Sequence, residues 1–258
     1  MKRPTRAPAV DVVVPVYNEA RVLRASITTL HAYLAANLPY PVTLTIAESG
    51  STDGTAAVAA ELAAELDGVR VRSDPVRGRG LAVRRAWETS EAEVVAFIDA
   101  DLSIGLDAFV PLLEPLVAGR CDLSVGSRHR RGATVRRSLH RAVLSRTLNL
   151  LLRVTLGARF TDAQCGFKAG RRDALLPVMR DVEAQHWFFD TELLVVAQRR
   201  GLRLHEVPVV CLDDPDTSVD LLPTVGGFLR EIARLVRSRR TPGPRPSAAG
   251  ADAEAVGA

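Results

Sequence analysis

The chain has 258 residues, 47% of them hydrophobic, so it is long enough to bury a full core in one large domain or two small ones. Its formal net charge of +4 is too modest to indicate a nucleic-acid-binding protein by itself. Its three widely spaced cysteines form neither a zinc-binding spacing nor a disulfide framework, which favours a reducing compartment and excludes a disulfide-stabilised scaffold.

Strands and helices are predicted to alternate along the first hundred residues. Short apolar runs rich in β-branched residues predict strands over 10–16, 42–47, 69–73 and 94–98. The segments between them have helical patterns, over about 19–36, 55–66 and 81–90, and we expect Asn18 to cap the first helix. This order indicates parallel βαβ units with helices on both faces of a sheet. Because such sheets bind ligands at the carboxyl ends of their strands, the loops after these four strands should line one crevice.

The rest of the chain continues the α/β pattern. We predict a helix over 106–116, a strand over 123–126, a long basic helix over 136–156, helices over 172–179 and 190–200, a strand over 204–210 and a helix over 221–238. Residues 1–9 read as a loose basic arm, and the Pro/Gly/Ala-rich residues 241–258 read as a disordered tail. The predicted domain therefore spans residues 10–240.

Two acids follow the strand predicted over 94–98. Asp99 and Asp101 are separated by one small residue, so on an extended chain their side chains share a face. Carboxylate oxygens at the end of a buried strand suit a hard divalent cation such as Mg²⁺ or Mn²⁺. The alternative is a surface turn with two solvated acids.

A block of arginines begins downstream of these acids. Between Arg120 and Arg159 there are ten arginines and a single acid, Asp122. Such a block indicates an anionic partner, which could be the phosphates of a small ligand, a membrane surface or nucleic acid, or it is simply a solvated basic helix face. The block lacks the interleaved aromatic residues of a single-strand-binding surface, so no nucleic-acid partner is expected.

Seven stretches, taken together and in this order, resemble the inverting glycosyltransferases of family 2. Within that family they are most similar to the polyprenyl-phosphate sugar synthases, the dolichyl-phosphate glucosyl- and mannosyltransferase type. The stretches are VVPVYNE at 13–19, GSTDGT at 50–55, RGLAVR at 79–84, DADLS at 99–103, GSR at 126–128, DAQCGFK at 162–168 and WFFDTEL at 187–193. The resemblance covers roughly residues 10–220.

The resemblance implies a GT-A fold, a single Rossmann-like α/β domain that uses a nucleotide diphosphate sugar and a divalent metal. It implies donor-binding roles for Pro15, Tyr17, Asn18, Glu19, Glu48, Asp53, Arg79, Asp99, Ala100 and Asp101. Of these, Asp53 matches the family's acid at the nucleoside pocket, and its alternative is a turn former before Thr55. The implied metal ligands are Asp99 and Asp101 with Gln164 close by, and Asp101, Arg128, Gln164 and Asp190 are the implied catalytic residues.

The implied acceptor is a polyprenyl phosphate, which is already an anion near neutral pH. It needs arginines to position it more than a base to activate it, and Arg128, Arg137 and Arg141 match the family's phosphate-binding loop and helix. The expected reaction is an in-line displacement at the anomeric carbon with inversion, assisted by positioning and charge stabilisation. Glu48 and Ser49 replace the Asp and the Asp or Asn usual in the family, which leaves UDP-glucose and GDP-mannose both open as donors.

Two other functions remain open from the sequence, a transferase with a soluble acceptor and a non-catalytic nucleotide-sugar-binding protein. The apolar segments are too short or too interrupted by arginines to span a bilayer comfortably. We therefore expect a cytoplasmic protein associated peripherally with the inner face of the membrane. The basic segment 136–156 and the basic helix ending at Arg240 would dock on anionic lipid.

Overall fold

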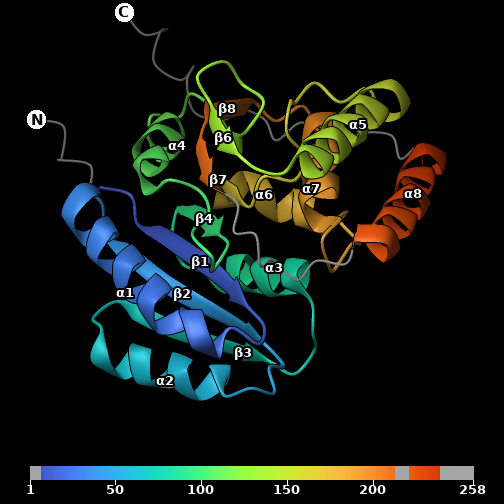
Figure 1. Ribbon diagram of the computed structural model, residues 1–258. Coiled ribbons are helices and arrows are strands. Elements are labelled where there is room, and N and C mark those ends of the chain that lie inside the picture. The colour runs from blue at the N-terminus through green and yellow to red at the C-terminus, as the bar shows by residue number, and fades with distance from the viewer. Residues whose placement is uncertain (1–6, 213–220, 239–258) are drawn as a thin grey trace, which may run out of the picture.

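Short apolar strands assemble into one seven-stranded sheet in the computed structural model, which describes residues 7–212 and 221–238 (Figure 1). The strand order is β3-β2-β1-β4-β7-β5-β8. The strands are β1 (Val10–Val16), β2 (Val42–Ser49), β3 (Val69–Asp74), β4 (Val94–Ile98), β5 (Leu123–Ser127), β7 (Phe167–Arg171) and β8 (Leu204–Pro208). A second sheet pairs β6 (Thr134–Arg136) with β9 (Val210–Leu212) in parallel. The predicted α/β class with a mostly parallel central sheet is confirmed.

Helices cover both faces of the large sheet, as its apolar strands require. One face packs against α1 (Ala20–Asn37), α2 (Thr55–Glu65) and α4 (Phe109–Val117), the last preceded by a 3₁₀ turn. The other packs against α3 (Arg79–Thr89), α6 (Arg172–Met179) and α7 (Phe189–Arg199), with α5 (Leu139–Leu156) and α8 (Leu221–Arg237) beyond them. Successive residues of β4 serve opposite faces, with Ala96 in the first core and Phe97 in the second.

Strands β6 and β7 were not predicted from the sequence, and the single strand predicted over 204–210 is divided into β8 and β9. No element was predicted at β7, an antiparallel strand that lies between β4 and β5 in the middle of the sheet. Its sequence, FKAGR, has none of the β-branched residues that mark a strand, and its second residue is a lysine. A helix was predicted to begin at residue 136, but in the structure residue 136 ends β6 and the helix, α5, begins at Leu139.

The register of the sheet brings the predicted loops to one edge. β1 runs parallel to both β2 and β4, so the chain leaves all three strands at the same edge, carrying Tyr17, Gly50 and Asp99 there. Because β7 is antiparallel, it starts where β4 ends, and Phe167 pairs with Ile98. Residues 162–166 therefore join this edge, as the opposite strand direction requires.

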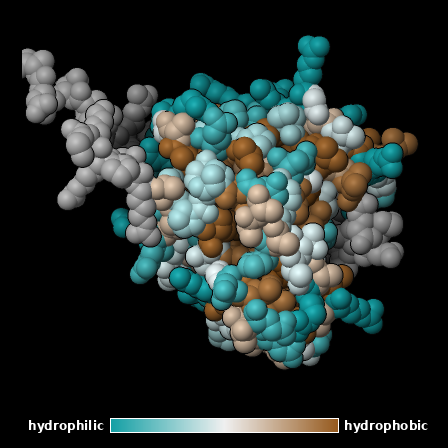
Figure 2. All heavy atoms as spheres, turned by 90° about the vertical axis from the view of Figure 1, so that its left-hand side faces the viewer, coloured by the Kyte–Doolittle hydropathy of each residue, from teal (hydrophilic) through white to brown (hydrophobic). Residues whose placement is uncertain are grey.

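The predicted arm and tail lie largely outside the described part of the chain. Residues 1–6, 213–220 and 239–258 are not described, so the loose arm over 1–9, the tail over 241–258 and the domain end at 240 remain predictions. Within the described residues, none of the helices combines the length and apolarity needed to cross a bilayer. Figure 2 shows the side of the molecule opposite α5 and α8, where hydrophilic residues alternate with scattered hydrophobic ones.

The packing of α3 on α7 depends on a glycine. A Cβ added to Gly80 would collide with the Phe189 side chain and lie 2.9 Å from the carbonyl oxygen of His186. We expect Gly80→Ala to lower the free energy of unfolding by about 1–3 kcal/mol, because overpacked cores must shift backbone or rotamers. Urea denaturation measures this change.

The matched control is Gly226→Ala in α8, where an added Cβ would meet no atom within 4 Å. There alanine's helix propensity should raise stability by about 0.5–1 kcal/mol. Equal effects of the two substitutions would contradict this account of the α3–α7 contact.

Candidate active site

The loops after β1 and β2 are held together by hydrogen bonds between them. The backbone N–H of Asn18 donates to Ser51 Oγ at 3.0 Å, and Asn18 Oδ1 accepts from the N–H of Thr52 at 2.8 Å. Asn18 has a φ of 55°, a left-handed conformation that asparagine tolerates better than most residues. Its side chain therefore links two loops and does not cap α1, so the predicted cap is wrong.

Asp53 caps the starts of two helices instead. Its Oδ2 accepts from the N–H of Ala20 at 3.2 Å, where α1 begins, and its Oδ1 accepts from the N–H of Thr55 at 3.1 Å, where α2 begins. The Thr55 hydroxyl donates to the same Oδ1 and, with these N–H groups, lowers the pKa of Asp53. The recorded contacts of Asp53 are thus those of a helix cap, and its nucleoside-pocket role stays a prediction.

The side chains of Glu48 and Ser49, the two departures from the family pattern, form hydrogen bonds with nearby backbone groups. Both are buried, and Glu48 Oε1 accepts from the N–H of Ser51 at 2.5 Å. The hydroxyl of Ser49 donates to the carbonyl of Val16 at 3.2 Å. Beside them, the guanidinium of Arg77 lies 4.2 Å from the ring centre of Tyr17, a cation–π contact that the sequence analysis did not foresee.

Asp99, the first acid of the Asp99-Ala100-Asp101 motif, is held by Arg79. Nε and Nη2 of Arg79 donate to Asp99 Oδ1 at 2.8 and 2.6 Å. The other oxygen, Oδ2, lies so close to Gly166 that a Cβ there would overlap it, and the carbonyl of Gly166 accepts from the N–H of Asp99 at 3.2 Å. The structure thus brings together three predicted motifs, those at 79–84, 99–103 and 162–168.

Asp190 lies behind Arg79 and is almost fully buried. It accepts from Arg79 Nη1 at 2.5 Å through Oδ2 and from Lys168 Nζ at 2.6 Å through Oδ1. Lys168 lies within the DAQCGFK motif but was not predicted to be a site residue. Its signal was rarity, because Lys168 and Lys2 are the only lysines among 34 basic residues.

The outer acids of the site repel one another electrostatically. Burial raises the pKa of Glu19, and the negative charges of Asp101, Asp53 and Asp99 raise it further. Asp101 is exposed, and its Oδ1 accepts one hydrogen bond, from the N–H of Ser103 at 3.0 Å. Ala100 between the two acids is buried and belongs to the hydrophobic core that packs against α1, α2 and α4.

These acids fit a hard divalent cation held partly by a ligand. Asp99 and Asp101 provide carboxylate oxygens, and Mg²⁺ sites at phosphates commonly use one or two carboxylates together with phosphate oxygens and water. Among the described residues, no three or more His, Cys, Asp or Glu side chains are grouped to hold a metal ion. Asp99 and Asp101 would leave the other coordination positions of such a cation to phosphate oxygens and water.

Gln164, the third predicted metal ligand, makes other contacts. Its amide nitrogen donates to Thr191 Oγ1 at 2.7 Å, and its backbone N–H donates to Asp162 Oδ1 at 3.2 Å. The first contact holds the 162–166 loop against α7, and the second lies within that loop. A metal-binding role for Gln164 stays a prediction.

Arg128 forms a buried ion pair with Asp162. Its Nε and Nη2 donate to Asp162 Oδ2 and Oδ1 at 2.7 and 2.9 Å, and its backbone N–H adds a third bond at 3.0 Å. Although burial opposes ionisation, Arg128 holds the pKa of Asp162 at about 2. The pair therefore stabilises the fold fully above the ordinary value of 3.8, and that contribution is lost as the pH falls through about 2.

Arg137 and Arg141 lie in the segment that leads from β6 into α5. Arg137 follows the last residue of β6, and Arg141 lies in the first turn of α5. Both are partly buried, and both interact with other groups of the protein. Their predicted contact with phosphate is not tested by this geometry.

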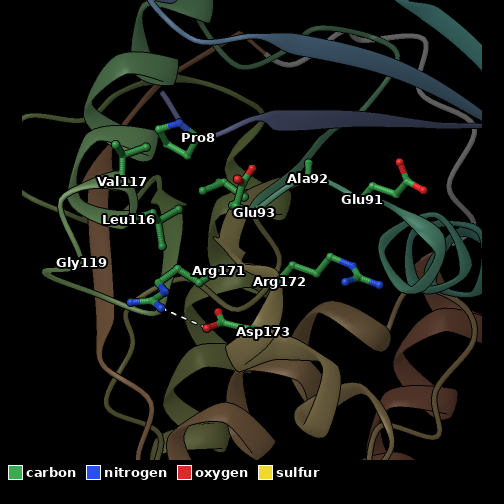
Figure 3. A pocket seen from close by; sticks show the side chains of 11 residues that line it. Pro8, Glu91, Ala92, Glu93, Leu116, Val117, Gly119, Arg171, Arg172 and Asp173 are labelled. Carbon is green, nitrogen blue, oxygen red and sulfur yellow. Dashed lines mark hydrogen bonds and ion pairs between the residues drawn. The ribbon is translucent and has the colours of Figure 1, made fainter. Parts of the chain in front are cut away.

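A cleft of about 470 Å³ opens at the opposite edge of the sheet (Figure 3). It includes Glu93, at the start of β4, together with Arg171 and Asp173, which pair at 3.0 Å. None of the predicted site residues lines it. The carboxyl edge, with its convergent acids and arginines, is the candidate active site.

The sequence profile of the glycosyl transferase family 2 matches residues 11–177. The chain is 39% identical over 242 residues to the glycosyltransferase AglD of Haloferax volcanii, which covers 90% of this chain but only 38% of that protein. It is 31% identical to the dolichyl-phosphate beta-glucosyltransferase ALG5C of Trichomonas vaginalis, covering 87% of this chain and 69% of that one. It is 32% identical to the polyprenol monophosphomannose synthase of Mycolicibacterium smegmatis, with 80% and 78% covered.

The fold is similar to that of solved GT-A glycosyltransferases. A structure of glucosyl-3-phosphoglycerate synthase from Mycobacterium tuberculosis with UDP matches with a TM-score of 0.64 and 25% identity over 89% of this chain and 79% of that one. The same enzyme with Mn²⁺, UDP and glucosyl-3-phosphoglycerate matches with a TM-score of 0.62 and 25% identity, covering 92% and 81%. The GT-A fold expected from the sequence is thereby confirmed.

Two bidentate pairs of the same geometry allow a test of the Arg128–Asp162 ion pair. Arg128→Met leaves a carboxylate buried without its cation, and we expect it to cost about 3–5 kcal/mol of unfolding free energy. Chemical denaturation at pH 7 without ligand measures this loss.

The control is Arg203→Met. Arg203 donates to Asp122 through the same three groups, at 3.0, 2.7 and 2.9 Å, but its side chain is 54% exposed. Its loss should cost no more than about 1 kcal/mol. If both variants were equally stable, Arg128 would be no structural cross-link.

Proposed function

Because the chain belongs to glycosyltransferase family 2, we propose that it moves a hexose from a nucleotide diphosphate sugar to a polyprenyl phosphate with inversion at the anomeric carbon. The observation that carries this proposal is the convergence of Asp99 and Asp101 with Arg79 at the carboxyl edge of the sheet. The relatives named as dolichyl-phosphate and polyprenol-phosphate sugar transferases support the acceptor class. UDP-glucose and GDP-mannose are the candidate donors.

The donor would lie across the loops after β1, β2 and β4. Pro15, Tyr17, Asn18 and Glu19 would border its base and ribose, with Glu48 and Asp53 shaping the pocket from the β2 side. Asp99 and Asp101, with Gln164 near them, would hold Mg²⁺ or Mn²⁺ on the diphosphate, supplying charge neutralisation to the leaving group. The solved structures of glucosyl-3-phosphoglycerate synthase with Mn²⁺ and UDP support this choice of metal and ligand.

In the proposed reaction a phosphate oxygen of the acceptor forms the new bond to the anomeric carbon. The bond from that carbon to the donor diphosphate breaks, and the diphosphate leaves with the electron pair. The acceptor phosphate is already ionised, so this step needs no general base. The contacts of Asp190 agree with this, because its two carboxylate oxygens are engaged by Arg79 and Lys168 and it lies behind Arg79.

The arginines would position the acceptor phosphate. Arg128 uses Nε and Nη2 on Asp162, so it would offer a phosphate its remaining Nη1. Arg137 and Arg141 would complete the phosphate site from the start of α5.

A soluble acceptor is the second candidate function. The solved structures similar to this chain include glucosyl-3-phosphoglycerate synthase with phosphoglyceric acid, a water-soluble phosphate. Turnover with a short-chain polyprenyl phosphate, compared with turnover on phosphoglyceric acid, separates the two candidates. Activity on the soluble acceptor alone would overturn the lipid assignment.

The role of Asp101 can be tested by a minimal substitution. We expect Asp101→Asn to lower kcat at least about 100-fold, because the amide removes a charge that the metal needs. The measurement is sugar transfer with Mn²⁺ at saturating donor.

Asp173→Asn is the control, since its side chain is 70% exposed at the opposite edge of the sheet. This control should keep wild-type activity. A nucleotide-sugar-binding protein without catalysis would have no turnover for Asp101→Asn to remove, and thermal shifts with UDP- and GDP-sugars would then report binding alone.

We place the peripheral membrane contact, on the cytoplasmic face, along the exposed side of α5. Leu139, Val143, Leu150 and Val154 are 85, 61, 59 and 76% exposed. Their spacing of four, seven and four residues puts them on one helical stripe, and exposed Arg146 and Arg153 lie along its margin. An apolar stripe bordered by arginines fits the surface of an anionic bilayer. The second predicted docking helix, α8, ends at Arg237, and Arg240 lies outside the described residues.

Vesicle sedimentation at low salt tests this surface. Val143→Glu/Leu150→Glu should lower binding to vesicles containing phosphatidylglycerol at least about tenfold, since it removes two apolar groups and adds two negative charges. Val22→Glu in α1, which is 43% exposed, adds charge on the far side of the molecule and should bind as the wild type does. Equal binding by all three proteins would exclude α5 as the docking face.

A further inference from the structure

Lys168 is a fully buried cation that the proposed reaction does not use. Its side chain is 0% exposed, and its Nζ atom lies 5.5 Å from the ring centre of Phe97, on the face of the sheet that packs against α3, α6 and α7. An ammonium group that leaves water costs free energy unless its charge is paired and its N–H groups all find acceptors. The environment of Lys168 meets both conditions.

The ammonium group has three acceptors for its three N–H bonds. Nζ donates to Asp190 Oδ1 at 2.6 Å, to the carbonyl of Cys165 at 2.7 Å and to the carbonyl of Ala163 at 3.3 Å. These acceptors converge on one point, which suits a compact ammonium group and does not suit the planar fork of a guanidinium. This explains why a chain with 34 basic residues, nearly all arginines, has a lysine here.

From Lys168 a chain of alternating charges runs to the site. Lys168 bonds Asp190, Asp190 bonds Arg79, and Arg79 bonds Asp99. The exposed fractions of these four side chains are 0, 3, 12 and 33%, so the chain runs from the interior to the surface of the site. Two positive and two negative charges make it neutral.

A second connection from Lys168 reaches the same carboxylate. The two carbonyls that accept from Nζ belong to the loop that ends at Gly166, and Gly166 contacts both the backbone and the carboxylate of Asp99. Asp99 is therefore fixed on one side by Arg79 and on the other by this loop. Both supports are anchored on one ammonium group.

We propose that Lys168 is a positioning residue for the donor site, which fixes the Asp99 carboxylate through Asp190 and Arg79 and through the 163–166 loop. This inference rests on the proposed function for the identity of the ligand. If the charge of Lys168 is removed, Arg79 is the one cation that still pairs with Asp190 among the described residues, and Asp190 draws it away from Asp99. Asp99 then loses the fixed orientation in which it would meet the metal and the diphosphate.

The test measures ligand binding as well as turnover. Binding of UDP or GDP, whichever the wild type binds with Mn²⁺, is followed by calorimetry, and melting temperature is recorded for each variant. We expect Lys168→Met to weaken Mn²⁺-dependent nucleotide binding at least tenfold and to raise the donor KM in parallel. Lys168→Arg should also weaken it, because the charge without the three converging contacts does not position the loop.

Thr45→Val is the control for a purely structural effect. Thr45 donates a buried hydrogen bond to Asp11 at 2.8 Å in the interior of the sheet, away from the loops of the site. This variant should melt at a lower temperature and bind nucleotide as the wild type does. If Lys168→Met lowered the melting temperature and left the dissociation constant unchanged, as this control does, the positioning role would be overturned.

A double variant keeps the test decisive if Lys168→Met does not fold. Lys168→Met/Asp190→Asn removes both buried charges together, so it leaves no unpaired ion in the core. The two residues act in series along the connection through Asp190 and Arg79, while Lys168 also holds the 163–166 loop. The double variant should therefore bind nucleotide no more tightly than either single variant but should lose less than the sum of their two losses. If the losses of binding free energy in the two single variants added fully in the double variant, the proposed series would be overturned.

The outcomes separate the two proposals. A wild-type protein that neither binds Mn²⁺ with a nucleotide nor transfers sugar refutes the proposed function. A wild type that does both, with a folded Lys168→Met protein that matches it, refutes only the positioning role.

Discussion

The antiparallel pairing of β7 with β4 determines which polar and charged groups lie at the carboxyl edge of the sheet. β7 enters the middle of the sheet antiparallel to β4, and the pair Ile98–Phe167 places Gly166 beside Asp99. The next residue pair, Phe97–Lys168, places an ammonium group beneath the same edge. A parallel strand at this position would deliver its polar loop to the other edge of the sheet. The direction of one short strand thus supplies both the wall of the site and its interior cation.

The sequence was sufficient for the fold class and for the edge that carries the site. In an α/β protein, an apolar run such as Val94–Ile98 indicates a strand covered on both faces. Because such strands are parallel, the loops that follow them lie at one edge of the sheet. The sequence was not sufficient to predict β7, because the residues of this strand fit contacts with neighbouring groups and have low strand propensity. Gly166 and Gly170 are required by close contacts, and Lys168 by a buried carboxylate, none of which leaves a periodic signal.

Two arginines also form ion pairs that the sequence did not indicate, while their predicted contacts with phosphate remain predictions. A block with ten arginines and one acid between Arg120 and Arg159 suggested that the cations await phosphates. In the structure Arg128 finds Asp162, which follows the block in sequence, and Arg79 finds Asp99 and Asp190 from two other motifs. Counting charges along the chain cannot detect such pairs, because the partners lie 20 to 111 residues apart. A long separation in sequence also explains why the sequence did not reveal that Asp53, and not Asn18, caps α1.

These pairings also distinguish the two acids of the motif. Asp99 belongs to a neutral chain of four charges, so its negative charge is already compensated inside the protein. Asp101 is exposed, and the only hydrogen bond recorded for it among the described residues comes from a backbone N–H. Burial raises the pKa of Glu19, and the negative charges of Asp101, Asp53 and Asp99 raise it further, so four carboxyl groups lie close together at the mouth of the site. A dianionic diphosphate would be repelled from this mouth unless a divalent cation entered with it. Under the proposed function, the uncompensated charge of Asp101 would therefore make donor binding and metal binding interdependent, while the compensated Asp99 would provide a fixed surface against which both are placed.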